Sequence, residues 1–119
     1  MNDTEYARLD HMIKNAFTAQ AVNETFQSLG NALQDFGSDV RLTMTISGHN
    51  RYLTLSKYQE SFKVCIYKSG DIDFHFKDPV YGDVRLRMVS YPDVNDLTAT
   101  LQKFRNQLDW ALNIFLYKQ

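Results

Sequence analysis

The chain has 119 residues, of which 44% are hydrophobic and 23% are charged, and its formal net charge at pH 7 is −1. This composition is typical of one folded domain and excludes an intrinsically disordered chain, while the near-neutral charge argues against a general nucleic-acid binder and against an acidic DNA mimic. Because Cys65 is the only cysteine, an intramolecular disulfide and a cysteine-based zinc site are excluded as well. The first residues lack the profile of a signal peptide and no apolar run approaches membrane-spanning length, so we expect a cytoplasmic protein with no membrane partner.

Residues 3–36 are predicted to be helical, with Asn2 and Glu5 at capping-box spacing and Gly37 as the C-terminal cap. The apolar stripe changes phase part-way, and at about 100° per residue the second stripe lies roughly 180° from the first. One straight helix cannot bury both stripes in one core. Either the chain breaks or bends sharply near residues 18–21, where no glycine or proline dictates a break, or one continuous helix places half of its length against another surface, most economically a second copy of the protein. The first stripe is Tyr6, Leu9, Ile13, Ala16 and Phe17, and the second is Val22, Phe26, Leu29, Leu33 and Phe36.

Residues 40–89 are predicted to form an antiparallel sheet of four to five strands. Apolar residues occupy every second position of 40–46 and of 84–88, with Arg or Thr between them. Such alternation is typical of a strand with one buried and one exposed face. The pattern is weaker between these runs, where a turn at Gly48 and a strand at 51–56 are expected.

Two alternating runs in residues 62–76 surround a glycine turn, and their register decides which side chains face the core. A two-residue loop at 69–70 would place the two apolar sets on opposite faces. A three-residue loop at 68–70 places them on one face, as a half-buried antiparallel pair requires, and it needs a residue in the left-handed region at its last position, which is Gly70. We therefore expect the three-residue register. Its apolar pairs are Ile66 with Ile72, Val64 with Phe74, and Phe62 with Phe76.

The same register extends to the strand at 84–89 if the chain continues as a meander through a turn at 78–83. Phe74 is then opposite Leu86 on the apolar face. On the other face, two of three predicted cross-strand pairs bring opposite charges together. These pairs are Asp73 with Arg87, Lys77 with Asp83, and His75 with Arg85.

Residues 94–117 are predicted to form a long helix with Asp93 as its N-cap and no glycine or proline inside. An apolar seam along it most simply packs on the sheet. A second stripe of Trp110, Ile114 and Tyr117 lies about 60–70° round from that seam. Two interpretations stay open: the N-terminal helical region buries this side, or the stripe is a protein–protein contact, because Trp and Tyr are enriched in interface cores. The seam consists of Leu97, Leu101, Phe104, Leu108, Ala111 and Phe115.

No catalytic motif stands out. Cys65, Asp73 and His75 are expected on one outer face of adjacent strands, but a flat sheet face supplies no oxyanion hole. Asp71, Asp73 and His75 alternate along one strand at about 6.8 Å between backbone positions, which is wide for joint ligation of a metal ion. We expect no catalytic residue, no metal and no cofactor.

These elements predict a single two-layer α+β domain over residues 1–119, with the helices covering the apolar face of the sheet. The leading hypothesis is a non-catalytic interaction protein, such as an adaptor, regulator, chaperone or inhibitor, that forms a homodimer through its helices. The partner of such a protein is not specified by the sequence. The predicted contact residues are Trp110, Ile114, Tyr117, Tyr6, Leu9 and Ile13.

The alternative hypothesis is a ligand- or nucleic-acid-binding module on the outer face of the sheet. Basic and aromatic side chains on this face suit a phosphate, a carboxylate or a single strand of nucleic acid. Acidic residues interleave with the basic ones, so nucleic acid is the less favoured partner. The predicted ligand-binding residues are Arg41, Lys63, Tyr67, His75, Arg85 and Arg87.

Overall fold

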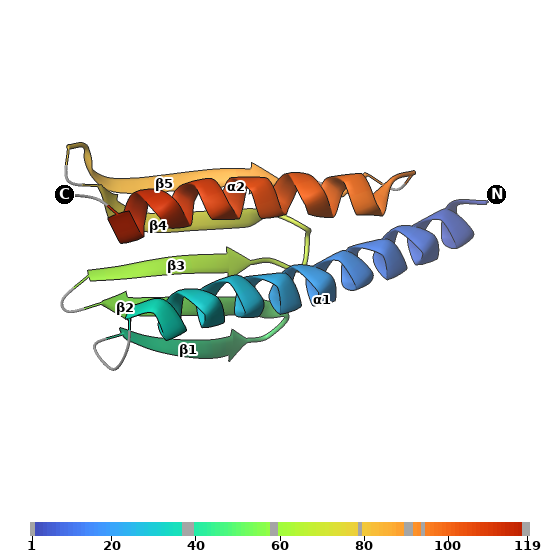
Figure 1. Ribbon diagram of the computed structural model, residues 1–119. Helices are drawn as coiled ribbons and strands as arrows, with labels where there is room; N and C mark the ends of the chain where they lie inside the picture. The colour runs from blue at the N-terminus through green and yellow to red at the C-terminus, as the bar shows by residue number, and fades with distance from the viewer. Residues whose placement is uncertain are drawn as a thin grey trace.

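Two helices and five strands build the protein (Figure 1). The computed structural model describes residues 2–36, 40–57, 60–78, 80–89, 92–93 and 95–117, apart from the side chains of Phe36, Val89 and Tyr117. The predicted α+β class and antiparallel sheet are confirmed, whereas the predicted cap at Gly37 lies outside the described residues. The elements are α1 (Asp3–Phe36), β1 (Val40–Ser47), β2 (Asn50–Lys57), β3 (Glu60–Ile66), β4 (Ile72–Asp78), β5 (Gly82–Val89) and α2 (Leu97–Tyr117).

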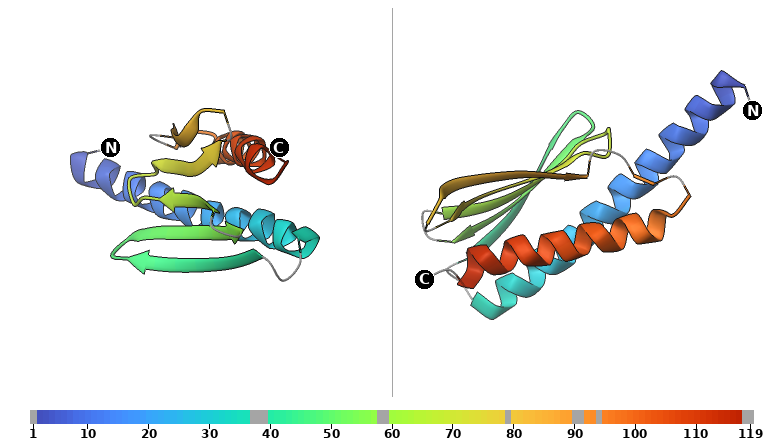
Figure 2. Two further views of the ribbon diagram at one scale, coloured as in Figure 1. Left: turned by 90° about the vertical axis from the view of Figure 1, so that its left-hand side faces the viewer. Right: turned by 90° about the horizontal axis from the view of Figure 1, so that it is seen from above.

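The strands form an antiparallel meander in the order β1-β2-β3-β4-β5, and both helices lie on one face of it. Helix α1 crosses β1, β2 and β3, while α2 covers β4 and β5. The helices run in the same general direction along the sheet (Figure 1). The opposite face, called here the outer face, carries no helix among the described residues (Figure 2).

The predicted register of β3, β4 and β5 is confirmed. Ile66 pairs with Ile72 and Val64 with Phe74, so the hairpin has the three-residue connection at 68–70. Gly70 adopts φ of +91°, and a Cβ there would lie 2.5 Å from Cδ of Pro92. Both the backbone conformation and the contact with Pro92 therefore require glycine at this turn. The pairs predicted between β4 and β5 are also present: Phe74 with Leu86, Asp73 with Arg87, His75 with Arg85, and Lys77 with Asp83.

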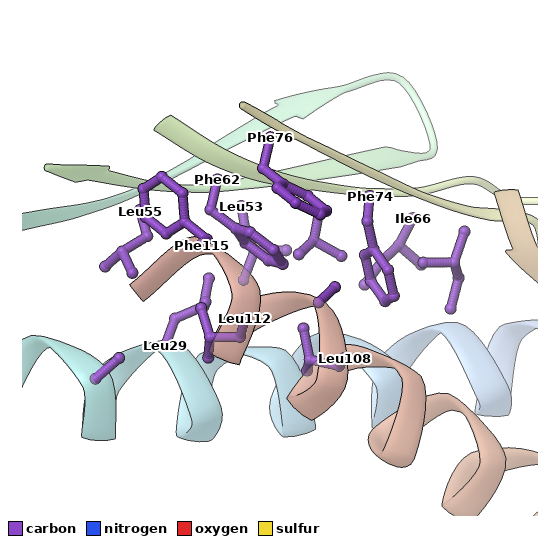
Figure 3. Packing of buried hydrophobic residues seen from close by; sticks show 14 of the residues in the cluster. Leu29, Leu53, Leu55, Phe62, Ile66, Phe74, Phe76, Leu108, Leu112 and Phe115 are labelled. Atoms are coloured by element: carbon purple, nitrogen blue, oxygen red, sulfur yellow. The ribbon is translucent and has the colours of Figure 1, made fainter. Parts of the chain in front are cut away.

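Aromatic rings fill the space between the sheet and the helices (Figure 3). Phe62 stacks on Phe76 with 5.6 Å between ring centroids, and Phe115 of α2 lies 5.7 Å from Phe62. At the other end of the core, Phe104 of α2 contacts Phe17 of α1 edge to face at 6.4 Å. All five rings are almost completely buried, so this cluster fixes both helices to the sheet.

Helix α1 is continuous over 34 residues, so of the two alternatives for residues 3–36 the structure has the unbroken helix. Its residues from Phe17 onward contact the core, while residues 3–16 extend past the end of the sheet (Figures 1 and 2). We call residues 3–16 the α1 overhang. Its length explains why the molecule is 53 Å long and has a radius of gyration of 15.4 Å, where about 13.5 Å is typical of a compact chain of this size.

Helix α2 begins at Leu97, so the predicted start at residue 94 is wrong; Val94 itself lies outside the described residues. The N-cap is Asp96, whose Oδ1 accepts a hydrogen bond of 2.9 Å from the backbone N–H of Ala99. Asp93 instead accepts from the N–H of Asn95 and closes a local turn. Two aspartates with capping chemistry stand close together, and only the second begins the helix. Neither described helix is long and apolar enough to cross a membrane.

Candidate functional site

A polar cluster around Asp73 occupies the middle of the outer face. Arg87 donates two hydrogen bonds to the Asp73 carboxylate, from Nε at 2.8 Å and from Nη2 at 3.1 Å, and the Tyr67 hydroxyl donates a third at 3.1 Å. The Arg87 guanidinium also lies 5.6 Å from the centre of the Tyr67 ring, against which Tyr52 packs edge to face. The residue at the centre, Asp73, is only 7% exposed although neither of the two described helices covers this face.

The cluster shifts the pKa values of its members in directions that follow from these contacts. The hydrogen bond from Arg87 lowers the pKa of Asp73 and in turn raises the pKa of the guanidinium. Burial, followed by the hydrogen bond to Asp73, raises the pKa of Tyr67 to about 12. At neutral pH the cluster therefore holds an ionised carboxylate, a protonated phenol and a guanidinium that satisfy one another.

Cys65 is paired directly with Asp73 across β3 and β4, as predicted. Burial and the negative charge of Asp73 raise the pKa of the Cys65 thiol, which disfavours the thiolate that nucleophilic chemistry uses. Asp71 and Asp73 both contact Arg87, at 3.7 Å and 2.8 Å, so these carboxylates face a cation. The described residues contain no group of three His, Cys, Asp or Glu positioned around a common metal.

The structure divides the predicted ligand-binding set. Arg87 and Tyr67 are engaged by Asp73, whereas Lys63, His75 and Arg85 are direct neighbours in one row across β3, β4 and β5. No hydrogen bond or ion pair joins the side chains of this row to other described residues. Arg41 lies apart on edge strand β1, opposite Ser56.

An open concavity of about 810 Å³ adjoins one end of the row at Lys63 and His75. Cations and carboxylates both line it, so its charge is mixed. The remaining lining residues are Glu60, Ser61, Phe76, Lys77 and Asp83.

The predicted partner-binding residues fall into two separate places. In the α1 overhang, Tyr6 is 60% and Leu9 is 43% exposed, and Ile13 is partly buried. On α2, Trp110 is 54% exposed, while Ile114 packs against the core; the Tyr117 side chain lies outside the described part of the chain. Among the described residues of this predicted set, the exposed apolar side chains are therefore Tyr6 and Leu9 on α1 and Trp110 on α2.

The sequence-based prediction missed two features. Met12, 59% exposed, is a further apolar side chain of the overhang, about 60° round the helix from Leu9. Arg51 lies on the helix-facing side of the sheet, directly opposite the fully buried Ile66, where the alternation of β2 would place an apolar residue. The signal was available, because Arg51 has the same parity as the core residues Leu53 and Leu55.

No protein-family model, no curated protein and no solved structure matches this chain. Any functional assignment therefore depends on the surfaces described above.

Proposed function

We propose that this protein is a non-catalytic interaction protein that self-associates through the α1 overhang. The observation that supports it is the continuity of α1: the helix extends about four turns past its last contact with the core and carries exposed apolar side chains on the way. Isolated helices of about 14 residues are marginal in water. A second surface packed on the overhang would supply the missing stabilisation.

The apolar side of the overhang has the spacing of a helix–helix contact. Tyr6, Leu9 and Ile13 follow one another at intervals of three and four residues, and the small Ala16 continues the pattern. Such spacing is that of the core positions of two packed helices. Phe17, at the end of the same stripe, is buried against Phe104 of α2, whereas Tyr6, Leu9 and Ile13 precede the part of α1 that contacts the core.

A second copy of the chain is the occupant that fits best. Two overhangs can pair antiparallel about a two-fold axis, so that each stripe covers the same stripe of its partner. Each overhang is about 21 Å long and extends past the ends of the strands (Figure 2), so in such a pair the two sheets would lie toward opposite ends of the contact.

The test is the mass in solution. Size-exclusion chromatography with light scattering at high micromolar concentration should give twice the chain mass of 13.9 kDa, and Leu9→Glu should give monomers. Ile46→Glu is the matched control, because Ile46 is 56% exposed on β1 and the change adds the same charge. A strict monomer for the unmodified chain contradicts the proposal, as does dissociation by Ile46→Glu with Leu9→Glu still dimeric. Trp110→Ala reports whether α2 contributes to the contact.

A second candidate function is favoured by the row of Lys63, His75 and Arg85, which places two cations on either side of an imidazole on the outer face. An anionic ligand or a single strand of nucleic acid would be attracted to these side chains. Salt-sensitive binding of an oligonucleotide, lost in Arg85→Glu, is the expected result. Absence of binding at low salt removes this candidate.

A further inference from the structure

A second concave surface lies on the sheet side of α1, where the helix passes over the turns of two hairpins. Two concavities, of about 380 Å³ and 460 Å³, adjoin there and share Lys68. The first is lined by α1 residues and by His49 and Arg51 of the first hairpin, and the second by the start of α1 and the turn at Lys68 and Ser69. We call the two together the α1 groove. Their combined size is that of a small-molecule site.

Arg51 is the unusual residue of the groove. It is partly buried, on the face of the sheet that otherwise forms the core, next to Ile66. Its Nη1 donates only to backbone oxygens, of Gly48 at 3.4 Å and of Asn50 at 3.2 Å, and no carboxylate lies within ion-pair distance among the described residues. A partly buried guanidinium that has no carboxylate partner among the described residues can form charge-assisted hydrogen bonds with an anion in the groove.

The rest of the groove has the same electrostatic character. The first concavity has two cationic side chains, Arg51 and Lys68, and no acidic one. In the second, Asp10 forms an ion pair of 3.1 Å with Lys14, so Lys68 is the remaining cation of its lining. This is a local excess of positive charge in a chain whose formal net charge is −1.

The groove is held together before any ligand binds. Asn50 Oδ1 accepts a hydrogen bond of 3.3 Å from the backbone N–H of Lys68, which ties the first hairpin turn to the second. Gly48 adopts φ of +61° in its turn, and the pair Ser47–Asn50 closes that turn. Arg51 and Lys68 thus come from different hairpins but have a fixed separation at the backbone, which lowers the entropic cost of binding.

We infer that the α1 groove binds a small molecule carrying a phosphate monoester, with Arg51 and Lys68 as the residues that contact the phosphate. A phosphate monoester carries a charge of about −1.5 to −2 at neutral pH, which matches these two cations better than a single carboxylate does. The planar guanidinium suits two parallel hydrogen bonds to phosphate oxygens. Ala19 and Val22 supply an apolar wall for the organic part, and Asn15 and Asn23 supply amides.

This inference does not rest on self-association. Arg51 and Lys68, the residues assigned to the phosphate, belong to the two hairpins, while the Tyr6–Leu9–Ile13 stripe belongs to α1, so the two proposals assign different side chains. The phosphate experiment below is therefore read out independently of the mass in solution.

The experiment is a titration followed by ¹⁵N–¹H correlation spectra, at constant ionic strength maintained with chloride. Inorganic phosphate, adenosine 5′-monophosphate, adenosine and oligothymidylate are the probes. Both phosphate and the nucleotide should give saturable shifts at the amides of residues 48–51, 67–69 and 15–23, with the nucleotide binding more tightly than phosphate and adenosine giving no shifts. Absence of saturable shifts with both phosphate and nucleotide overturns the inference, and so does binding of the oligonucleotide alone, which carries diesters.

Charge-matched variants test the assignment of the residues. Lys68→Gln and Arg51→Gln should each weaken nucleotide binding about ten-fold, the loss expected for one charge-assisted contact. Arg85→Gln removes the same charge from the outer face and should leave the affinity within about two-fold. Lys68 is exposed in a turn, so its variant tests the site even if Arg51→Gln does not fold. Equal affinity in the wild type and in Lys68→Gln, or equal loss in Arg85→Gln, contradicts the assignment.

Discussion

Both faces of the sheet have a buried side chain near their centre, but different interactions bury it. On the inner face, Phe74 is fully buried because the two helices cover this face and apolar side chains pack on the ring. On the outer face no described helix covers Asp73, and three hydrogen bonds from Arg87 and Tyr67 enclose it instead. The difference teaches that this sheet is not a one-sided surface: its open face has a preorganised polar core of its own.

The largest loss of stability is expected from a substitution on the inner face. Phe74→Ala should lower the free energy of unfolding by about 3–5 kcal/mol, because it opens a cavity among fully buried rings. His75→Ala, at the next position of β4 but pointing to the outer face, should cost less than about 1 kcal/mol. Urea denaturation of both variants checks the comparison, and similar losses at the two positions would contradict it.

The second largest loss of stability is expected at the turn between β3 and β4, which sets which residues face the core. Gly70→Ala should cost about 1–3 kcal/mol for the backbone conformation, with a further loss from the overlap with Pro92. Gly30→Ala is the control, because Gly30 is helical and no atom lies within 4 Å of the added Cβ. That change should stabilise the protein by about 0.5–1 kcal/mol. Thermal denaturation of the pair gives opposite signs if the turn depends on Gly70 as described.

Removing the charge at the centre of the outer face should have a smaller effect. Asp73→Asn replaces acceptors of a charged hydrogen-bond pair, so a loss of about 1.5–3 kcal/mol is expected in urea denaturation. Asp83→Asn makes the same change at an exposed position of the neighbouring strand and should cost less than about 1 kcal/mol. Equal losses would mean that the cluster around Asp73 adds nothing beyond surface charge.

The pH dependence of the free energy of unfolding gives a further test of the contribution of Asp73. Since Arg87 lowers the pKa of Asp73 in the folded state, the stabilisation from Asp73 is present above its unfolded pKa of about 4 and is lost as the pH falls through the lowered folded value. The stability difference between the wild type and Asp73→Asn should therefore shrink on acidification. An unchanged difference at pH 3 and pH 7 would contradict the assigned direction.

The smallest expected effect is a shift in the pKa of the Tyr67 phenol, which is measured by titration at alkaline pH. Tyr67 has its pKa raised to about 12, so its contribution is complete below about pH 10 and is lost as the pH rises through 12. Absorbance of tyrosinate in Asp73→Asn should show one phenol ionising earlier than in the wild type, because the acceptor of the Tyr67 hydroxyl has lost its charge. Tyr67→Phe identifies that phenol by removing it from the curve.

The pairing at the centre of the outer-face cluster could be predicted from the sequence because it follows from the strand register. The alternation of apolar and polar residues together with Gly70 predicts that Asp73 pairs with Arg87. The hydrogen bond from Tyr67 depends on side-chain rotamers, which the register does not determine. The continuity of α1 was not decidable in this way, since residues 18–21, where the stripe changes phase, contain no glycine or proline that would dictate a break. The start of α2 was misplaced because local turn chemistry at Asp93 resembles an N-cap.

The α1 groove could not be predicted from the sequence, for a different reason. Its lining comes from three elements whose approach depends on the angle at which α1 crosses the sheet, and no periodicity encodes that angle. Arg51 alone gave a local signal, as a charged residue with core parity in β2. The part of a site that lies within one strand pair is predictable, and the part that depends on packing between layers is not.

The contact between Phe17 and Phe104 has a consequence for synthesis of the chain. The meander forms from neighbouring segments as they emerge, but the described helix that covers the inner faces of β4 and β5 is α2, which is translated after both strands. At about 5–20 residues per second, the 21 residues of α2 take roughly 1–4 s to translate. During that interval Phe74 and Phe76 are open to other nascent chains, so the order of the elements sets a window in which aggregation competes with folding.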